Sequence, residues 1–406
     1  MMPIFLIDQE TVFTYDYLLK DINNAIAYYP MFRTINLYDF FLNFVISLAS
    51  NKPIVLIDSD LNNSEIEGIN EKSVNLAYPI KQVCFSSIEE IVKCIQVSKS
   101  EISIYTSGTT GQPKKVVHTV STLTRYIRVS DRYAEQIWGF AYNPTHMAGV
   151  QVFFQAFENI NTIVNVFNKN RQQVYDSIDK YGITHISATP TFFRLLLPIE
   201  KTYDSIKRVT LGGEKSDNKL YEFILQIFPG AKINNIYAST EAGSLFVANG
   251  ENFRIPANII DKIKIKDNEL MIHKSLLGKS DSFNFQGEYF FTNDLIEWTN
   301  KEEGLFRFVS RKNELINVGG YKVNPLEVES VIQQLPDVIQ VMVYGKANSV
   351  LGNVLCAEVK LQEFSALSEF SIRQYLSEKL QDFKIPRKIK FVNFISLTRT
   401  GKIKRL

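Results

Sequence analysis

The sequence predicts an α/β protein with three parts. These are a large N-terminal body of mainly parallel sheets flanked by helices, a small β-barrel-like part within it, and a small α+β C-terminal lid domain. Three observations predict this class: strand–helix alternation up to about residue 250, short strands with turn residues after it, and a new pattern from about residue 310. At roughly 150 residues per domain, 406 residues correspond to two or three domains.

The body begins with apolar runs that have the length and composition of buried strands. They are KPIVLID (52–58), EISIYT (101–106), QIWGFAY (136–142), NTIVNVF (161–167), ITHISAT (183–189), SIKRVTLG (205–212) and KINNIY (232–237). Helical stretches at 171–181, 191–198 and 217–228 lie between several of them, which favours parallel sheets with helices on their faces. The apolar stretch 35–49 is broken by polar residues and is shorter than the ~20 residues of a membrane span, so we interpret it as a buried helix.

The antiparallel part is expected at about 245–310, where the segment FRIPANIIDKIKIKDNELMIHKS is typical of a barrel or meander. Beyond it, Asn324, Pro325 and Glu327 combine an N-cap, proline at the first helical position and glutamate at N3. Strands at 338–344 and 353–360, a helix near 368–382 and a strand near 388–394 complete the small domain. We therefore expect two domains, 1–310 and 311–406.

Composition excludes several classes of protein. An apolar fraction of 45% excludes a disordered chain, and a net charge of +2 gives no reason to expect nucleic acid or an anionic membrane as partner. Three cysteines are too few for a disulfide framework and favour a reducing compartment. The first residues lack the basic and apolar regions of a signal peptide. We expect a cytoplasmic protein with no membrane span and no nucleic-acid partner.

The most informative segment is YTSGTTGQPKKV, residues 105–116, which follows a predicted strand. Glycines allow the backbone to approach an anion, while hydroxyls and a lysine supply further donors. The spacing fits neither GxxxxGK(S/T) nor GxGxxG, and a polar surface turn explains the twelve residues together poorly. The expected phosphate-binding residues are Thr106, Ser107, Gly108, Thr109, Thr110, Gly111 and Lys114.

This segment resembles the phosphate-binding motif of the adenylate-forming (ANL) superfamily, which includes acyl-CoA synthetases and aryl-CoA ligases. Later segments resemble the further motifs of that family in the same order. They are PTHMAG (144–149), ATPTFFRLL (188–196), LGGE (211–214), NNIYASTEAG (234–243, with Ala238 in place of the usual glycine), GEYFFTNDL (287–295), SRKNELINVGGYKVNPLEVE (310–329) and LTRTGKIKR (397–405). The resemblance therefore covers about residues 105–405.

The resemblance implies an ATP-dependent, AMP-forming acid–thiol ligase. In such enzymes a carboxylate attacks the α-phosphorus of ATP and expels pyrophosphate, and a thiol then takes the acyl group from the adenylate. The reacting groups implied here are Lys402 as the adenylation lysine, Thr240 at the α-phosphate, Glu241 as the Mg²⁺ ligand and His146 at the acyl pocket. The nucleotide would also contact Gly212 and Gly213, Tyr237 stacked on adenine, and Asp294 and Arg311 at the ribose.

The sequence leaves the substrates open. Family members that activate amino acids carry an Asp in the segment between Gln136 and Phe157, and no acidic residue occurs there in this chain, so the resemblance argues against an α-amino acid. An aromatic acid and a medium aliphatic acid both stay open. Phe192 and Phe193 fit an apolar pocket or the core equally well. The thiol is that of CoA or of the phosphopantetheine arm of an acyl carrier protein. The alternative is a non-catalytic nucleotide-binding or scaffolding protein on the same fold.

Two departures from the family pattern stand out. The phosphate loop begins at Tyr105, earlier than in typical members, so we expect a shortened N-terminal region. The hinge position, usually Asp or Lys in the family, falls on the uncharged Asn313, which affects the expected rotation of the small domain.

Overall fold

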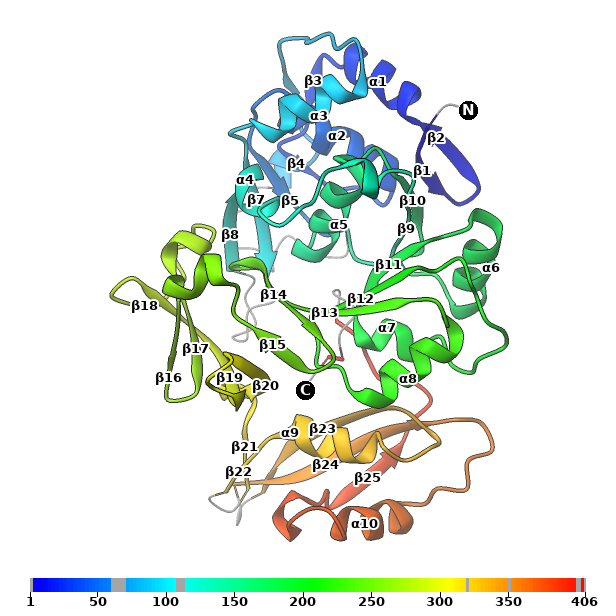
Figure 1. Ribbon diagram of the computed structural model, residues 1–406, viewed down its shortest axis with the longest axis vertical. Coiled ribbons are helices and arrows are strands. Elements are labelled where there is room, and N and C mark those ends of the chain that lie inside the picture. The colour runs from blue at the N-terminus through cyan, green and yellow to red at the C-terminus, as the bar shows by residue number, and fades with distance from the viewer. Residues whose placement is uncertain are drawn as a thin grey trace.

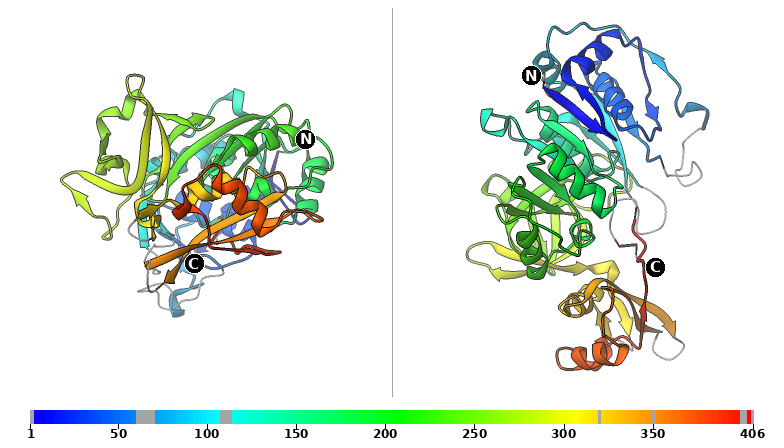
Figure 2. Two further views of the ribbon diagram at one scale, coloured as in Figure 1. Left: turned by 90° about the horizontal axis from the view of Figure 1, so that it is seen from below. Right: turned by 90° about the vertical axis from the view of Figure 1, so that its right-hand side faces the viewer.

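The computed structural model describes residues 3–59, 71–106, 114–318, 321–348, 352–398 and 403–404. Three tiers follow one another along the long axis of the molecule: an N-terminal unit, a central body of sheets and a small C-terminal domain (Figure 1). The side view shows the last described residues running from the small domain back towards the body (Figure 2).

The N-terminal unit is built around the buried helix α2 (Leu37–Ala49), where an apolar helix was expected. It packs with α1 (Tyr15–Asn24) and α3 (Ile88–Gln96). A hairpin of β1 (Ile4–Asp8) and β2 (Thr11–Thr14) joins this unit to the body because β1 pairs in parallel with β10. Among the described helices, none is long and apolar enough to cross a bilayer.

Two small sheets lie beside these helices. One is the pair β3 (Ala27–Tyr28) and β6 (Tyr78–Pro79), and the other has the order β4 (Met31–Phe32), β5 (Ile54–Leu56), β7 (Glu101–Thr106), β8 (Lys114–Thr119). Strands β7 and β8 are antiparallel, and Thr106 is the Cα partner of Lys114 at their ends. The two flanks of the expected phosphate loop therefore lie side by side. Strand β8 leads into α4 (Val120–Leu123).

In the described residues the body is a 14-stranded sheet, and five strands of its parallel half were predicted from the sequence. Its strands are β9 (Ile137–Phe140), β10 (Thr162–Asn165), β11 (His185–Ala188), β12 (Arg208–Gly212) and β13 (Lys232–Ser239). The connecting helices are α5 (Met147–Phe157), α6 (Arg171–Tyr181), α7 (Pro190–Arg194) and α8 (Asn218–Ile227). Alternate strand residues such as Ile186, Val209 and Leu211 share a core with α6 and α8.

The antiparallel half continues the same sheet, because β14 hydrogen bonds to β13. Its strands are β14 (Gly243–Asn249), β15 (Asn252–Arg254), β16 (Ile263–Lys266), β17 (Glu269–His273), β18 (Phe285–Gln286), β19 (Tyr289–Asn300) and β20 (Leu305–Arg311). The barrel-like part is thus continuous with the parallel sheet and has a core of its own around Phe246, Ile272 and Phe306. The predicted α/β fold class is confirmed in both halves.

The small domain begins where the chain leaves the large sheet after Arg311. Its strands are β21 (Ile316–Val318), β22 (Tyr321–Val323), β23 (Val338–Asn348), β24 (Gly352–Leu361) and β25 (Lys388–Phe391), with helices α9 (Pro325–Ile332) and α10 (Glu369–Ser377). The expected N-cap is confirmed, since the Asn324 side chain accepts a hydrogen bond from the Leu326 amide. Short 3-10 helices complete the chain at 71–73, 131–133, 257–262, 274–276, 312–314 and 382–384.

Candidate active site

A cavity of about 1200 Å³ lies where the two halves of the large sheet, helix α5 and strand β8 meet. Nine of the site residues expected from the sequence line it: Lys114, His146, Gly212, Gly213, Tyr237, Thr240, Glu241, Asp294 and Arg311. Ser107, Gly108, Thr109, Thr110, Gly111 and Lys402 lie outside the described residues. The ends of β7 and β8, Thr106 and Lys114, bring the chain to the cavity on either side of the expected loop.

Asp294 is held on both of its carboxylate oxygens. The register of β19 and β20 makes Asp294 and Arg311 Cα partners, and Arg311 Nε donates to Asp294 Oδ1 at 2.9 Å. The Tyr237 hydroxyl, from β13, donates to Oδ2 at 2.6 Å. The adjacent carboxylate raises the pKa of Arg311, while burial and the Asp294 charge raise the pKa of Tyr237. Asp294 is thus a buried acceptor whose remaining lone pairs are available at the cavity wall.

The ring of Tyr237 packs inside the protein. Its centroid lies 4.3 Å from that of Phe308 with the planes 13° apart, and 5.5 Å from that of Phe246. These contacts fix the hydroxyl towards Asp294. The stacking of Tyr237 on adenine, implied by the family resemblance, stays a prediction.

The turn that carries Thr240 and Glu241 is fastened to strand β8 by His118, a residue that sequence reasoning missed. His118 Nε2 lies 2.7 Å from the Thr240 carbonyl oxygen, and Nδ1 lies 3.2 Å from Thr122 Oγ1. Burial lowers the pKa of His118 to about 4, so the imidazole is neutral at physiological pH. The neighbouring Gly278 is required by this arrangement, because a Cβ there would lie 2.6 Å from the His118 ring.

His146 is the N-cap residue of α5 and borders the cavity. Its Nε2 lies 3.4 Å from Oδ2 of Asp58, a buried carboxylate that also accepts a hydrogen bond from Asn143 Nδ2 at 2.8 Å. A Cβ on Gly149 would lie 2.2 Å from the Asn143 carbonyl oxygen, so only glycine allows the first turn of α5 to close on this loop. The Asn143 contact explains the glycine of PTHMAG, while Asp58 lies next to His146 Nε2 without hydrogen bonding to it.

Gly212 ends strand β12 at the cavity, and Gly213 follows it with a positive φ of +84°, which favours glycine. The next residue, Glu214, accepts hydrogen bonds from the Thr191 amide at 2.9 Å and from the Ile403 amide at 3.1 Å. Ile403 directly follows Lys402 in the sequence. Glu214 therefore joins the cavity rim to the end of the small domain.

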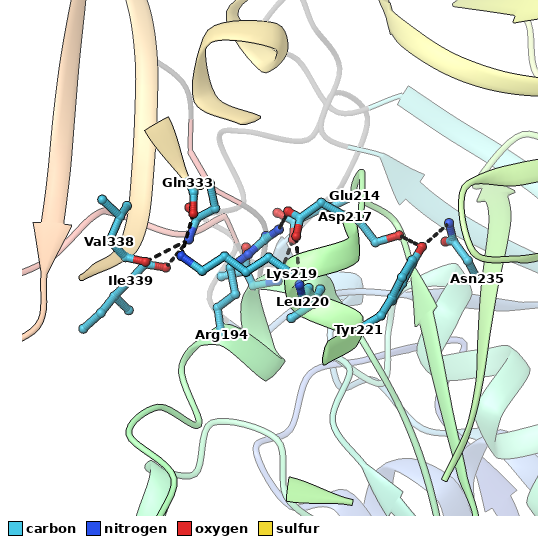
Figure 3. Close-up of polar contacts among 12 residues, drawn as sticks. Arg194, Glu214, Asp217, Lys219, Leu220, Tyr221, Asn235, Gln333, Val338 and Ile339 are labelled. Carbon is cyan, nitrogen blue, oxygen red and sulfur yellow. Dashed lines mark hydrogen bonds and ion pairs between the residues drawn. The ribbon is translucent and has the colours of Figure 1, made fainter. Parts of the chain in front are cut away.

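Lys219 makes a second contact between body and small domain (Figure 3). Its Nζ donates to the carbonyl oxygens of Gln333 and Leu335, both at 2.7 Å, just beyond the end of α9. Burial lowers the pKa of Lys219. The start of α8 is itself braced by the ion pair of Asp217 with Arg194 at 2.6 Å (Figure 3).

Two further lining residues escaped the sequence analysis. Glu269, on β17, is buried and accepts hydrogen bonds from the Asn293 amide at 2.9 Å and from Lys312 Nζ at 3.2 Å. Lys312 could have been identified from the sequence because it directly follows Arg311. Glu269 could not, because it lies in an ordinary alternating strand with no motif around it.

The donors and acceptors of the cavity suit a magnesium nucleotide. Lys114, Arg311 and Lys312 provide cations, and the lining acids are Glu241, Glu269 and Asp294. No three His, Cys, Asp or Glu side chains of the described residues form a metal cluster. A Mg²⁺ ion held mainly by phosphates and water needs only one or two protein carboxylates, a requirement that Glu241 meets.

Comparison with known families agrees with this arrangement. The sequence model of the "AMP-binding enzyme" family matches residues 53–270, and that of the "AMP-binding enzyme C-terminal domain" matches residues 327–402. The 2-succinylbenzoate–CoA ligase of Staphylococcus aureus (strain MRSA252) is 27% identical over 332 residues, covering 74% of this chain and 65% of the relative. The mitochondrial acyl-coenzyme A synthetase ACSM4 of Rattus norvegicus is 26% identical over 381 residues, 80% of this chain and 63% of the relative. The matched chain thus spans less than two thirds of these relatives.

Solved structures share the fold at lower identity. O-succinylbenzoate CoA synthetase (MenE) from Bacillus subtilis, in complex with its acyl-adenylate intermediate, has a TM-score of 0.72 at 21% identity and covers 99% of this chain and 94% of that one. The amide bond synthetase McbA from Marinactinospora thermotolerans has a TM-score of 0.75 at 14% identity, covering 100% and 96%. The small domain is therefore present in the same overall architecture.

Proposed function

The chain belongs to the AMP-binding enzyme family, and we propose on that basis that it activates a carboxylic acid with ATP and passes the acyl group to a thiol. The observation that carries the proposal is the convergence of nine expected residues, from segments between Lys114 and Arg311, on one cavity. A surface scaffold has no physical need to bring Lys114, Glu241, Asp294 and Arg311 to one place. The named relatives are ligases and synthetases of carboxylic acids with coenzyme A, which supports the same reaction class.

The first half-reaction forms a bond between a carboxylate oxygen of the acid and the α-phosphorus of ATP. The bond from that phosphorus to the bridging oxygen breaks, and pyrophosphate leaves with the electron pair. Asp294, fixed by Arg311 and Tyr237, accepts hydrogen bonds from the ribose. Glu241 would hold the Mg²⁺ that accompanies ATP, and Lys114 and Thr240, which line the same cavity, would contact the phosphates.

Lys402 is the cation proposed for the α-phosphate, where negative charge develops as the two bonds change. It directly precedes Ile403, whose amide hydrogen bonds to Glu214 at the cavity rim. His146, beside Asp58, borders the carboxylate of the acid. In the second half-reaction a thiolate attacks the carbonyl carbon and AMP leaves with the bonding electrons of the C–O bond, while the thiol proton passes to solvent.

The acid is aryl or acyl, and CoA is the proposed thiol, with a carrier-protein phosphopantetheine as the other candidate acceptor. The proposed domains are 1–310 and 311–406, with rotation of the second about the segment near Asn313 between half-reactions. We propose a cytoplasmic location, which is supported by three cysteines without disulfides, Cys84, Cys94 and Cys356.

Product analysis tests this function. The purified 406-residue chain is incubated with Mg²⁺, ATP and a panel of acids, with CoA or with holo-carrier protein, and the products are identified by mass spectrometry. The proposal predicts AMP, pyrophosphate and one acyl thioester in equal amounts. ATP binding without any acid-dependent AMP, from folded protein and across the panel, would instead favour a nucleotide-binding scaffold.

A further inference from the structure

The cavity extends well beyond the nucleotide residues along one face of the parallel sheet. Residues such as Ile186 and Val209 face the core shared with α6 and α8, so the alternate residues point the other way. Ser187, Thr210 and Asn234 are among these alternate residues, and they line the cavity. Phe192 and Phe193 pack in that core instead, and neither is among the lining residues. The wall beyond His146 is therefore more polar than an alkyl pocket requires.

Helix α5 forms the opposite wall of this arm. It begins beside His146 and lines the cavity with one face as far as Gln155, nine residues on, or roughly 13 Å at 1.5 Å per residue. The wall opposite α5, strand β12, gives the same length for this arm. From Gly212 at the nucleotide end to Arg208 is a distance of four residue steps, roughly 13 Å at 3.3 Å per residue. Gln155 donates to the Arg128 carbonyl, which places the segment around Arg128 at the far end of α5.

The far end of the arm carries positive charge. Strand register aligns Trp138 with His185, His185 with Arg208, and Arg208 with Lys232, at the amino ends of four adjacent strands. The cationic lining residues there are Arg128, Arg208 and Lys232. No ion pair within 4.0 Å joins any of them to an acid of the described chain, and the acids that line the cavity lie at its other end. Hydrogen bonding from Arg128, with charges including that of Arg208, lowers the pKa of Tyr133.

Buried hydrogen-bonding atoms of this arm are also unpartnered. Trp138, only 7% exposed, has an Nε1 without any hydrogen-bond partner among the described residues, and the same holds for the hydroxyl of Tyr126 and for the amide oxygen of Gln136. All three residues line the cavity. An indole N–H can only donate a hydrogen bond, and a buried donor without an acceptor is costly. The protein supplies no acceptor for this N–H, so a bound ligand has to supply it.

From these observations we propose that the acid substrate carries a second anionic group, roughly 13 Å from the reacting carboxylate and bound by Arg208, Lys232, Arg128 and Trp138. This inference rests on the proposed function and narrows its substrate from any aryl or acyl acid to a dianionic one. The reacting carboxylate lies by His146, and the distal anion supplies the missing acceptor. Plain alkanoic acids leave the buried Trp138 Nε1–H without an acceptor and gain nothing from the partly buried Arg208 or from the exposed Arg128 and Lys232, so they are poor substrates.

The test is acid-dependent ATP–pyrophosphate exchange, which needs no thiol. Matched pairs differ only in the distal group: octanoate and octanedioate, decanoate and decanedioate, dodecanoate and dodecanedioate, and aryl-substituted acids with and without a second carboxylate. We expect a kcat/KM at least 10-fold higher for the diacid of the best-fitting length. Arg208→Gln should raise its KM about 10-fold or more, the range of a lost charged hydrogen bond, and leave the monoacid within about 2-fold.

Two variants sharpen the result. Trp138→Phe keeps the ring and removes only the N–H, so it should raise the KM of the diacid several-fold and spare the monoacid. Lys207→Gln is the matched control, because Lys207 is exposed, does not line the cavity and loses the same charge one residue from Arg208. It should behave as the wild type.

The remaining outcomes overturn the inference in distinguishable ways. If monoacids are used as well as diacids or better, and Arg208→Gln does not change this preference, the substrate has no distal anion. The proposed ligase activity would still stand. A raised KM for CoA in the complete reaction, with exchange unchanged, assigns the basic end to the thiol substrate. No exchange with any acid, from folded protein that binds ATP, contradicts the proposed function itself.

Discussion

Arg311 Nε donates to Asp294 Oδ1 at 2.9 Å across the antiparallel pair β19–β20. Asp294 is buried and Arg311 is partly buried, so this ion pair fixes the Asp294 side chain at the cavity wall. We predict that Asp294→Asn weakens the binding of Mg–ATP by about 10-fold or more, since a charged acceptor is lost. Isothermal titration calorimetry measures this directly.

The same pair of strands offers a matched control. Glu297 and Arg307 form an ion pair at 2.9 Å in the same sheet, but both side chains are half exposed and neither lines the cavity. Glu297→Gln should leave ATP affinity within about 2-fold, as expected for an exposed pair. Equal losses in both variants would mean that Asp294 acts only through the stability of the strand pair.

The pH dependence of stability follows from two buried histidines. Burial lowers the pKa values of His118 and His185 to about 4 in the folded chain, against 6.5 for the free side chain. Below pH 6.5 the unfolded chain binds more protons, so stability falls as the pH drops from about 6.5 to 4. For His118 the loss approaches about 3 kcal/mol at the low end of that window.

Urea unfolding between pH 4 and 7 measures that slope. His118→Gln removes the titrating group, so its free energy of unfolding should fall less steeply over this window than that of the wild type. Parallel curves for the wild type and His118→Gln would show that His118 does not titrate in this range.

Gly149→Ala should destabilise the body by about 1–3 kcal/mol, because the new Cβ would meet the Asn143 carbonyl at 2.2 Å. Relief of this clash displaces the loop around Asn143 and with it His146. Acid-dependent activity should therefore fall together with stability. Thermal and urea unfolding provide the measurement. Gly230→Ala, where a Cβ meets nothing within 4 Å, should change stability by less than about 0.5 kcal/mol.

Lys219→Met should loosen the small domain from the body, since two hydrogen bonds of 2.7 Å to Gln333 and Leu335 are lost. The expected result is faster tryptic cleavage at Lys312, in the segment between the two sheets. Lys215→Met removes an exposed lysine just before the same helix and should not change the rate. Unchanged cleavage in Lys219→Met would show that this contact does not hold the domain.

Local patterns predicted the elements of the fold well. Helix 171–181 was expected at the residues where α6 lies, and the strands of the parallel half follow their apolar runs. The hairpin β1–β2 was missed because its turn residues, Gln9 and Glu10, are not the Asn or Gly that usually mark a turn of positive φ. The joining of both halves into one sheet through β13 and β14 depends on long-range pairing, which no local pattern records.

The sequence likewise predicted some residues of the site and missed others. Motifs identified Lys114, Glu241, Asp294 and Arg311, which the fold brings together. They did not identify His118, Asp58 or Glu269, because these side chains act through contacts between distant segments. His118 meets the Thr240 carbonyl 122 residues away, and Asp58 meets His146.

The most direct test of the central claim is acid-dependent exchange of labelled pyrophosphate into ATP, measured with the wild type and with Lys402→Ala. The account predicts exchange by the wild type with at least one acid. It also predicts a loss of at least about 100-fold in Lys402→Ala, which still binds ATP with near wild-type affinity by calorimetry. Wild-type protein that is folded and binds Mg–ATP but shows no exchange with any acid, or a variant that exchanges normally, would contradict it.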